Sequence, residues 1–405
     1  MGDVCIIGAG LTGLSAGLAL AQAGAAVTIL EARQPGAGAT GASGGQLIPG
    51  FRHGAVALVE RFGVERARRL FGLTLSARDR TAALATPACA FRPTGHLTAA
   101  SFRSDRRWMA AEARSLAVDM AYPDVGLLAA ADLPRHVGAG HYHAGLFDRG
   151  GGHIDPSAYA LALADHAVAA GAVLHVDRTA LAIAETPRGV NVSTATGPVQ
   201  ADQLIIACDA SVDQLNINGS RRRFAGQLMP VHSYSIATAP LPADLAATLL
   251  PGNAAVSDTR FALDYYRLDA QARLLFSGGE RYTPDPTADV AAVVRPRLAA
   301  VFPMLADIEF ERAWRGTVAI TMTRFPILGH QGRLWHAHGY SGHGLLLAQA
   351  SGQAIADAML GNRADFELLA GLPLRRWPGG AAARRPLYTA GMLALALRDR
   401  LKAAA

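Results

Sequence analysis

The stretch VCIIGAGLTGLSAG, residues 4–17, decides the fold of the N-terminal part of this chain. The apolar run from Asp3 to Ile7 is typical of a buried parallel strand. The Ala- and Leu-rich run from Leu14 to Ala23 predicts a helix, and a second apolar run, Val27 to Leu30, follows it. Strand, glycine-rich turn, helix and strand in this order form a βαβ unit, so we expect a Rossmann-like parallel sheet.

The turn of this unit carries the pattern GxGxxG, and an acid stands just after the second strand. Gly8 allows the tight turn, Gly10 lets the backbone approach a pyrophosphate, and Gly13 lets helix and strand pack closely. Glu31, 18 residues after Gly13, is placed to accept hydrogen bonds from a ribose. The predicted nucleotide-binding residues of this unit are Gly8, Gly10, Leu11, Thr12, Gly13, Glu31, Ala32 and Arg33.

The next stretch, EARQPGAGATGASGGQLIPG at residues 31–50, distinguishes two kinds of dinucleotide. A unit that binds NAD usually continues into another helix, whereas these residues are mostly small and show little periodicity. A long loop of small residues inside a nucleotide-binding domain suggests backbone that lies along a large cofactor. We therefore expect FAD.

A second glycine cluster lies more than 300 residues later, in HAHGYSGHGLLLAQASGQAIADAM, residues 336–359. A short apolar strand leads into Gly339, Gly342 and Gly344, and a long apolar helix follows. A helix that starts near Gly342 directs backbone N–H groups and the positive end of its dipole toward an anion. FAD has a phosphate end and a ring end, so the two clusters would bind opposite ends of one cofactor. A helix start that only packs closely is the alternative.

Composition limits the class of protein. The chain has 405 residues, of which 51% are hydrophobic and 17% charged, so a large core is expected. The formal net charge is +6, but the arginines are scattered and no recognition motif is present, so we expect no nucleic-acid partner. Cys5, Cys89 and Cys208 show no metal-ligand spacing, so we expect no metal. Without a signal peptide or an apolar span, we expect a cytoplasmic location.

Five short stretches distributed over the chain resemble one family of flavoproteins. They are GASGGQL at 41–47, LDYYRL at 263–268, AITMTRFPILG at 319–329, GYSGHG at 339–344 and LAGLPLRRWPGG at 369–380. The set is similar to that of the D-amino-acid-oxidase-type FAD oxidoreductases, the group that includes glycine oxidase and sarcosine oxidase. Within this group it is most similar to the gamma-glutamylputrescine oxidases.

The resemblance implies an α/β fold with a discontinuous, Rossmann-like FAD-binding domain and an α+β substrate-binding domain built on a mixed sheet. The FAD-binding domain would comprise residues 1–50, 145–225 and 320–375. The substrate-binding domain would comprise residues 51–144 and 226–319, and residues 376–405 would form a C-terminal helical tail.

The resemblance also implies positions along the cofactor. Ala180 would contact adenine through its backbone. Ala207 and Cys208 would lie near the pyrophosphate, and residues 43–46 would pass the flavin ring. The cofactor residues implied in the two glycine-rich loops are Thr40, Gly41, Ser43, Gly44, Gly45, Gln46, Tyr340, Ser341, Gly342, His343, Gly344 and Leu345.

The chain departs from its relatives in three ways. Sarcosine oxidases attach FAD to a cysteine in the stretch that matches GTVAITMT, residues 316–323, which has none here, so FAD should be bound noncovalently. Glycine oxidase holds the substrate carboxylate with an arginine in the same stretch, where this chain has Val318 or Ala319. The oxygen-activating lysine of sarcosine oxidase has no counterpart, because the only lysine is Lys402.

The resemblance implies an oxidase that deaminates an amine by hydride transfer to the flavin, with molecular oxygen as acceptor and hydrogen peroxide as product. The amine would be similar to gamma-glutamylputrescine. Gln46, Tyr265, Tyr266 and Arg324 are the predicted pocket residues, and only one of the two neighbouring tyrosines can point inward. Three alternative functions remain: an oxidase of an amino acid or N-substituted glycine, a dehydrogenase, and a flavin-binding protein without turnover.

The tail RRPLYTAGMLALALRDRLK, residues 384–402, has an apolar stretch with basic residues at both ends. We expect a helix that packs on the FAD-binding domain. A helix that lies on an anionic membrane surface or on a second subunit is the alternative.

Overall fold

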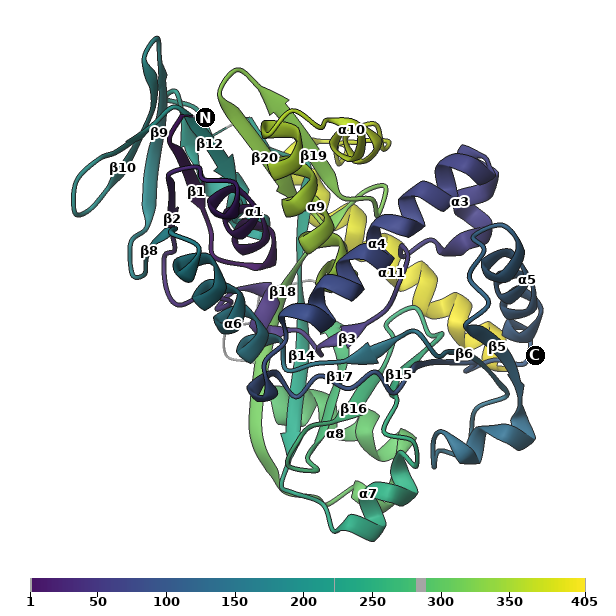
Figure 1. The fold of residues 1–405 in the computed structure, drawn as a ribbon. Coiled ribbons are helices and arrows are strands. Elements are labelled where there is room, and N and C mark those ends of the chain that lie inside the picture. Colours follow the sequence, from purple (N-terminus) through teal and green to yellow (C-terminus); the bar gives the residue numbers. More distant parts are fainter. Residues whose placement is uncertain (1, 222, 282–288, 405) are drawn as a thin grey trace.

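The computed structural model describes residues 2–221, 223–281 and 289–404, and shows one unit built on a parallel sheet beside another built on a larger mixed sheet (Figure 1). The expected ranges 1–50, 145–225 and 376–405 each include one residue outside this description, and the range 226–319 includes residues 282–288. The predicted α/β architecture with a second, mixed sheet is confirmed.

The first unit contains a six-stranded sheet in the order β19-β20-β12-β1-β2-β8. Neighbouring strands are parallel, except that β19 is antiparallel to β20. The apolar run that opens the chain is fully buried, because β1 lies between two parallel neighbours. The strands are β1 (Val4–Ile7), β2 (Val27–Leu30), β8 (Val173–His175), β12 (Gln203–Ile206), β19 (Ile327–Gln331) and β20 (Leu334–His338).

The two faces of this sheet are covered differently. Along β1, Val4 and Ile6 pack into the helical core, whereas Cys5 and Ile7 pack into the core beneath a four-stranded sheet. The four-stranded sheet has the order β11-β10-β9-β13. Its strands are β9 (Ala180–Thr186), β10 (Gly189–Thr194), β11 (Val199–Ala201) and β13 (Asn216–Ile217), and the turn η3 (Asp209–Gln214) precedes β13.

The helical face is organised by two helices that cross closely. A Cβ on Gly352 of α9 would lie 2.2 Å from the carbonyl oxygen of Thr12 in α1. α1 begins at Leu11, earlier than the predicted start at Leu14, because the turn ends at Gly10 and the helix starts inside the glycine pattern. The helices of this unit are α1 (Leu11–Gln22), α2 (Ala39–Ala42), α6 (Pro156–Ala169), α9 (Gly344–Met359) and α10 (Ala364–Ala370).

Helices α3 (Gly54–Phe62) and α4 (Val64–Leu84) lie within the range expected for the substrate-binding domain. Their buried residues Leu58, Leu70 and Phe71 nevertheless pack in the same core as α1 and α9. We therefore propose that residues 54–84 belong with the FAD-binding unit.

The second unit contains an eight-stranded mixed sheet in the order β18-β14-β17-β16-β15-β4-β6-β5. The expected boundary at residue 145 falls inside β6, which belongs wholly to this sheet, so we propose a boundary after residue 148. The strands are β4 (His96–Ala99), β5 (Val125–Ala129), β6 (Ala144–Asp148), β14 (Leu228–Thr238), β15 (Ala255–Asp258), β16 (Tyr265–Leu268), β17 (Leu274–Arg281) and β18 (Phe310–Thr321).

Shorter elements complete this unit. The core beneath its sheet includes Tyr266, Phe276 and Phe302 together with the buried face of α8. A two-stranded sheet of β3 (Gln46–Leu47) and β7 (Gly152–His153) follows the first glycine-rich loop. The remaining elements are α5 (Asp105–Val118), α7 (Ala243–Leu249), α8 (Val290–Val301) and the 3-10 turns η1 (Pro87–Cys89), η2 (Ala130–Arg135) and η4 (Pro303–Leu305).

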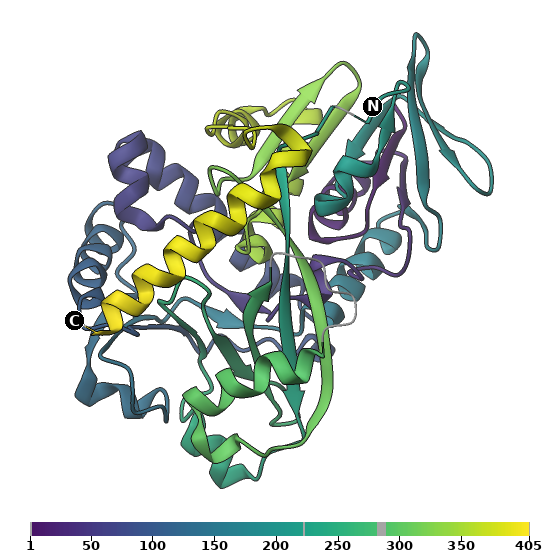
Figure 2. The ribbon, with the colours of Figure 1, turned by 180° about the vertical axis from the view of Figure 1, so that it is seen from behind.

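The C-terminal helix α11 (Gly380–Ala404) packs along the molecule and crosses from the first unit to the second (Figure 2). The expected packing on the FAD-binding unit is therefore only part of its contacts. Leu393, Leu397 and Leu401 are 57–68% exposed on its outer side. Contact of this side with a membrane surface or a second subunit stays a prediction. In the part of the chain that the structure describes, no helix is long and apolar enough to cross a membrane.

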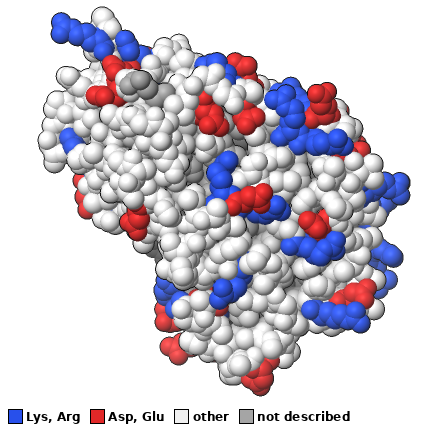
Figure 3. All heavy atoms as spheres, viewed as in Figure 1, with Lys and Arg blue, Asp and Glu red and all other residues white. Residues whose placement is uncertain are grey.

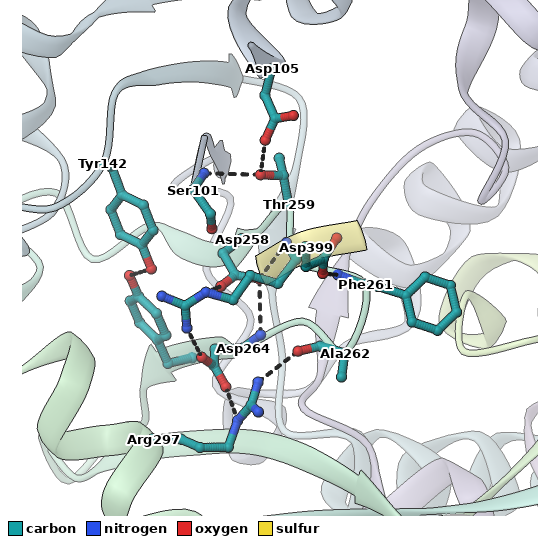
Figure 4. A network of polar contacts seen from close by, with 12 residues as sticks. Ser101, Asp105, Tyr142, Asp258, Thr259, Phe261, Ala262, Asp264, Arg297 and Asp399 are labelled. Carbon is teal, nitrogen blue, oxygen red and sulfur yellow. Dashed lines mark hydrogen bonds and ion pairs between the residues drawn. The ribbon is translucent and has the colours of Figure 1, made fainter. Parts of the chain in front are cut away.

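A buried polar network holds the loop between β15 and β16 (Figure 4). Asp264 bridges two guanidinium groups, with Oδ1 2.6 Å from Nε of Arg297 and Oδ2 2.8 Å from an Nη atom of Arg260. Asp258 accepts the backbone N–H of Asp264 at 3.0 Å. Burial, followed by the neighbouring charge of Asp264, raises the pKa of Asp258 to about 7.

This raised pKa predicts a pH-dependent contribution to stability. Because the pKa of Asp258 is higher in the folded protein than its ordinary value of 3.8, its favourable contribution is complete below about pH 4. That contribution is lost as the pH rises through about 7. Asp258→Asn keeps an acceptor oxygen but cannot ionise. We therefore expect the Tm of this variant, relative to wild type, to rise between about pH 5 and pH 8.

Thermal scans of the two proteins across this range measure the effect. The exposed Asp307 provides the control. The difference in Tm between Asp307→Asn and wild type should be the same at every pH in this range. A constant Tm difference for Asp258→Asn would show that its carboxyl group titrates normally.

Candidate functional site

The glycines of the β1–α1 turn are required for different reasons. Gly8 has a φ of +106°, and a Cβ there would lie 2.7 Å from the carbonyl oxygen of Ala207. A Cβ on Gly13 would lie 1.9 Å from the carbonyl oxygen of Gly8. At Gly10 φ is −85°, and a Cβ would meet only Oγ1 of Thr40, at 3.4 Å. The fold therefore needs Gly8 and Gly13, whereas Gly10 leaves a space at the N-terminus of α1.

Glu31 connects this turn to the end of β2. Its Oε2 accepts the backbone N–H of Ala9 at 2.8 Å, and its Oε1 accepts that of Arg33 at 3.0 Å. The backbone N–H of Arg178 donates to the carbonyl oxygen of Glu31 at 2.8 Å, which brings the start of β9, with Ala180, to the same edge. A carboxylate oxygen with one donor can accept another, so this group is placed to bind hydroxyl groups.

The end of β12 joins the two glycine-rich loops. Ala207 packs against Gly8, and Cys208 follows it. Asp209, in the left-handed conformation with φ +41°, accepts the backbone N–H of Gly339 at 2.8 Å. Burial raises the pKa of Asp209 to about 6. Sequence reasoning stopped at Cys208 and missed this acid, although an aspartate directly after a buried strand was a visible signal.

The second glycine-rich loop lies against the N-terminal half of α1. The hydroxyl groups of Tyr340 and Thr12 are 2.6 Å apart, and both side chains are buried. α9 begins at Gly344 without a side-chain cap, as α1 begins at Leu11. Each of these helix N-termini presents backbone N–H groups and a positive dipole end, and the contact between Tyr340 and Thr12 connects the two loops.

The residues between Tyr340 and α9 have conformations that favour close approach. Ser341 and Gly342 have φ values of +55° and +83°, and a Cβ on Gly342 would meet only Cγ1 of Val318, at 3.8 Å. Nε2 of His343 lies 3.1 Å from the carbonyl oxygen of Ile48. Burial, and then the charge of Arg52, lowers the pKa of His343 to about 4, so its imidazole is neutral near pH 7.

The loop of small residues after β2 lies between these helix N-termini and the second unit. Thr40 Oγ1 accepts the backbone N–H of Leu11 at 3.4 Å, and Gly41 and Ala42 follow in α2. The hydroxyl group of Ser43 is buried and has no hydrogen-bond partner. An orphaned hydroxyl is unfavourable unless a ligand or water completes it, so this loop fits a bound polar group.

Tyr265 and Arg267 meet this loop from β16. A Cβ on Gly44 would lie 2.8 Å from the ring of Tyr265, and the Tyr265 hydroxyl is 3.1 Å from Oγ of Ser233. Nε of Arg267 donates to the carbonyl oxygen of Gly44 at 2.5 Å. Arg267 is 5% exposed and positions the loop, a role that sequence reasoning had missed.

The structure brings only some of the predicted pocket residues to this place. Tyr266 points the other way, into the core of the second unit, where its hydroxyl is 3.0 Å from that of Tyr142 and its ring stacks on Phe276. Nε2 of Gln46 donates to the carbonyl oxygen of Val256 at 2.9 Å, so this amide joins β3 to β15. Tyr266 is therefore withdrawn as a pocket residue, because neighbours on a strand face opposite sides.

Arg324 follows β18 in a left-handed turn, with φ +61°. Its charge, together with that of Arg61 and Arg52, adds to burial in lowering the pKa of His53. Arg324, Arg61 and Arg52 therefore form a cationic group beside the start of α3. The group lies on the side of the loop where His343 contacts Ile48.

These features fit FAD. The space at Gly10, the orphaned Ser43 hydroxyl and the two helix N-termini would accommodate a long cofactor with a pyrophosphate at one end and an electron-rich ring at the other. Of the remaining predicted cofactor residues, Ala32 directly follows Glu31, Gly45 lies in the loop of small residues, and Leu345 is the second residue of α9. Within residues 2–221, 223–281 and 289–404, no group of His, Cys, Asp and Glu could hold a metal ion.

The fold and these two loops define a dinucleotide-dependent oxidoreductase, and comparisons with known proteins identify the family. The family model for FAD dependent oxidoreductases, abbreviated DAO, matches residues 3–358. The chain belongs to this family, which acts on amines or amino acids with FAD as cofactor. The predicted family and cofactor are confirmed.

Two curated relatives are similar over nearly their whole length. Gamma-glutamylputrescine oxidoreductase of Escherichia coli K12 is 33% identical, with 98% of this chain and 93% of that protein covered. The probable oxidoreductase OrdL of Rhizobium meliloti is 35% identical, with 98% and 92% covered. Among solved structures, glycine oxidase from Geobacillus kaustophilus matches with a TM-score of 0.70 at 24% identity, over 88% of this chain and 94% of that one.

The different roles of the glycines predict that Gly10→Ala separates cofactor binding from folding. Its methyl group enters the space beside the α1 N-terminus but contacts the protein only at Thr40. We expect the apoprotein to keep its Tm, while its Kd for FAD rises at least tenfold, about 1.4 kcal/mol. Gly13→Ala is the control and should destabilise the apoprotein itself. An unchanged Kd for Gly10→Ala would show that no ligand approaches Gly10.

Proposed function

We propose that this enzyme oxidises a primary amine whose anionic group is several bonds from the oxidised carbon, a substrate similar to gamma-glutamylputrescine, with oxygen as acceptor. The observation that carries the proposal is the apolar character of the sheet face beside the α9 N-terminus. The similarity to the E. coli gamma-glutamylputrescine oxidoreductase supports the same substrate class.

The face is formed by the antiparallel strands β14 and β18. A Cβ on Gly316 would lie 2.9 Å from Cβ of Ala42, and a Cβ on Gly342 would lie 3.8 Å from Cγ1 of Val318. This face therefore meets both glycine-rich loops. Cross-strand neighbours share a face, so the pairs on it are Gly316–Ser233, Val318–Val231 and Ile320–Met229.

This face explains why simple amino acids should be poor substrates. Residues 228–233 and 316–323 contain no arginine. The α-carboxylate of an amino acid oxidised here would be buried among valines without a partner, which is unfavourable. An amine with a methylene chain instead gains from apolar contact.

The cationic group beside α3 is placed for a remote anion. Arg324 lies just past the end of β18, and Arg52 affects both His53 and the buried His343. A guanidinium group can bind a carboxylate through two parallel hydrogen bonds. We assign Arg324 this role, at a distance from the reacting carbon that the methylene chain bridges.

The chemistry divides between cofactor and protein. A bound FAD, held by the two glycine-rich loops, would supply the two-electron oxidation, and amine, oxygen and water would together give aldehyde, ammonia and hydrogen peroxide. The protein orients the amine: the hydroxyl groups of Tyr265 and Ser233, beside Gly44, are placed to hydrogen-bond its nitrogen. Val231 and Val318 exclude water from the same place.

The first test is substrate preference. Specificity constants for gamma-glutamylputrescine, putrescine, glycine and sarcosine should rank in that order, with the first at least tenfold above glycine, about 1.4 kcal/mol. Coupled detection of hydrogen peroxide measures oxidase turnover. A flavin that the amine reduces anaerobically but that gives no peroxide in air would indicate a dehydrogenase, and a flavin that no amine reduces would indicate a binding protein without turnover. Arg324→Gln should lower kcat/KM for gamma-glutamylputrescine but leave putrescine unchanged. Faster oxidation of glycine or sarcosine would instead support an amino-acid or N-substituted-glycine oxidase.

The second test concerns the attachment of FAD. Residues 316–323 contain no cysteine, and Cys5 and Cys89 are buried away from the flavin-ring loops. Acid precipitation should therefore release all yellow colour into the supernatant. Colour retained in the pellet would demonstrate a covalent bond.

A further inference from the structure

The C-terminal helix α11 packs on the sheet face that the proposed amine would contact. Tyr388 is 6% exposed, although most apolar side chains described on this helix point to solvent. It belongs to a small apolar cluster that is separate from the large cores. The buried members are Met229, Val231, Ile320 and Tyr388, and the partly buried members are Phe261, Val318 and Trp377.

This cluster is continuous with the flavin-ring loops. Val318 belongs to the cluster, and its Cγ1 would lie 3.8 Å from a Cβ on Gly342, just before the start of α9. Val231 lies directly opposite Val318 in the neighbouring strand. One apolar surface therefore extends from the α9 N-terminus along the sheet to Tyr388.

The segment that leads into α11 is fixed where β14 begins and β18 ends. The backbone N–H of Trp377 donates to the carbonyl oxygen of Gly226 at 2.7 Å, and its indole Nε1 lies 3.4 Å from the carbonyl oxygen of Ile320. The rings of Trp377 and Tyr388 pack edge to face with centroids 5.6 Å apart. These contacts hold Tyr388 against β18.

The other end of α11 is fixed to the second unit (Figure 4). Asp399 accepts the backbone N–H of Phe261 at 2.7 Å. Nζ of Lys402, the only lysine of the chain, lies 3.4 Å from Oδ1 of Asp105. Phe261 lies in the loop that leads directly into Tyr265, so α11 holds the segment that presents this tyrosine to Gly44.

The sequence of α11 separates an inner side from an outer side. Tyr388, Asp399 and Lys402 are spaced by 11 and 3 residues, close to whole helical turns, so they share one side. Leu393 and Leu397 fall on the opposite side and are 68% and 57% exposed. The inner side carries the contacts of Tyr388, Asp399 and Lys402, and the outer side provides Leu393 and Leu397 as control positions.

We propose that α11 forms the outer wall of the substrate site, with Tyr388 as a specificity-determining residue that contacts the aliphatic part of the amine and excludes water from the flavin. Asp399 is a positioning residue that acts through Phe261 and the loop before Tyr265. The contact between Tyr388 and the aliphatic chain rests on the proposed amine-oxidising function. The exclusion of water from the flavin by α11 does not depend on that function.

The first experiment measures the wall without turnover. Iodide quenching of FAD fluorescence in the holoenzyme should increase at least threefold in Tyr388→Ala and stay at the wild-type value in Tyr388→Phe and Leu393→Ala. If Tyr388→Ala does not retain FAD, Tyr388→Leu replaces it with the same threshold. Unchanged quenching would overturn the proposal. If no amine reduces the wild-type flavin but quenching increases, the proposed function fails and the wall stands.

The second experiment measures specificity. The ratio of kcat/KM for benzylamine to that for butylamine should rise at least tenfold in Tyr388→Ala, because removal of the ring widens the site for a bulkier amine. The ratio should not change in Leu393→Ala. An equal loss for both amines would indicate a merely structural role and overturn the specificity assignment.

The third experiment isolates the contact at Asp399. Hydrogen exchange of the segment that contains Phe261 should be at least tenfold faster in Asp399→Ala, whereas Asp399→Asn, which keeps an acceptor oxygen, should restore most of the protection. Exchange at the wild-type rate in Asp399→Ala would remove Asp399 from this role.

Discussion

The site depends on the close crossing of α1 and α9. Gly352 allows the α9 backbone to reach the carbonyl oxygen of Thr12, and the Thr12 and Tyr340 hydroxyl groups meet just above the crossing. Neither N-cap residue makes a side-chain hydrogen bond, so the N-terminus of each helix presents backbone N–H groups to a ligand. The positive dipole end of each helix favours an anion. A dinucleotide with anionic character at both ends satisfies both N-termini.

The sequence predicted the parts of the site that depend on short-range patterns. The strand, the glycine pattern and Glu31 stand within 30 residues, so chain connectivity alone places them. The second loop was predicted because a strand, several glycines and an apolar helix are contiguous. In both cases the glycines themselves reveal the backbone conformation, since Gly8 and Gly342 have φ values above +80°.

The parts that failed depend on long-range packing. Which of Tyr265 and Tyr266 points inward is set by the register of β16 beside β17, which no local pattern encodes. The role of Arg267 in positioning the loop was missed because its partner, the carbonyl oxygen of Gly44, is more than 200 residues away. The positions of α3 and α4 follow from apolar faces that fit either core by composition, and only the three-dimensional packing distinguishes them.

The arginine-rich composition also has a structural reason that the net charge does not reveal. On the face shown in Figure 3, basic and acidic side chains are intermingled, with no continuous basic patch. Several arginines act within the fold: Arg297 and Arg260 bind a buried carboxylate, and Arg267 binds a loop carbonyl. A planar guanidinium group can serve several acceptors at once, which suits a chain whose long loops must be fixed between two sheets.

The division of labour within the site follows from these constraints. The proposed cofactor half is built from backbone groups, which almost any residue can supply, so glycines and helix ends suffice. The proposed substrate half is built from side chains on β14, β18 and the loop before Tyr265, where a single change would alter the chemistry that is accepted. Two strands and a loop present only one side to a ligand, so a site of this kind needs an outer wall. Since α11 reaches this face with a buried tyrosine and is fixed at both ends, the proposed wall comes from the C-terminal part of the chain, after every residue predicted to bind the cofactor.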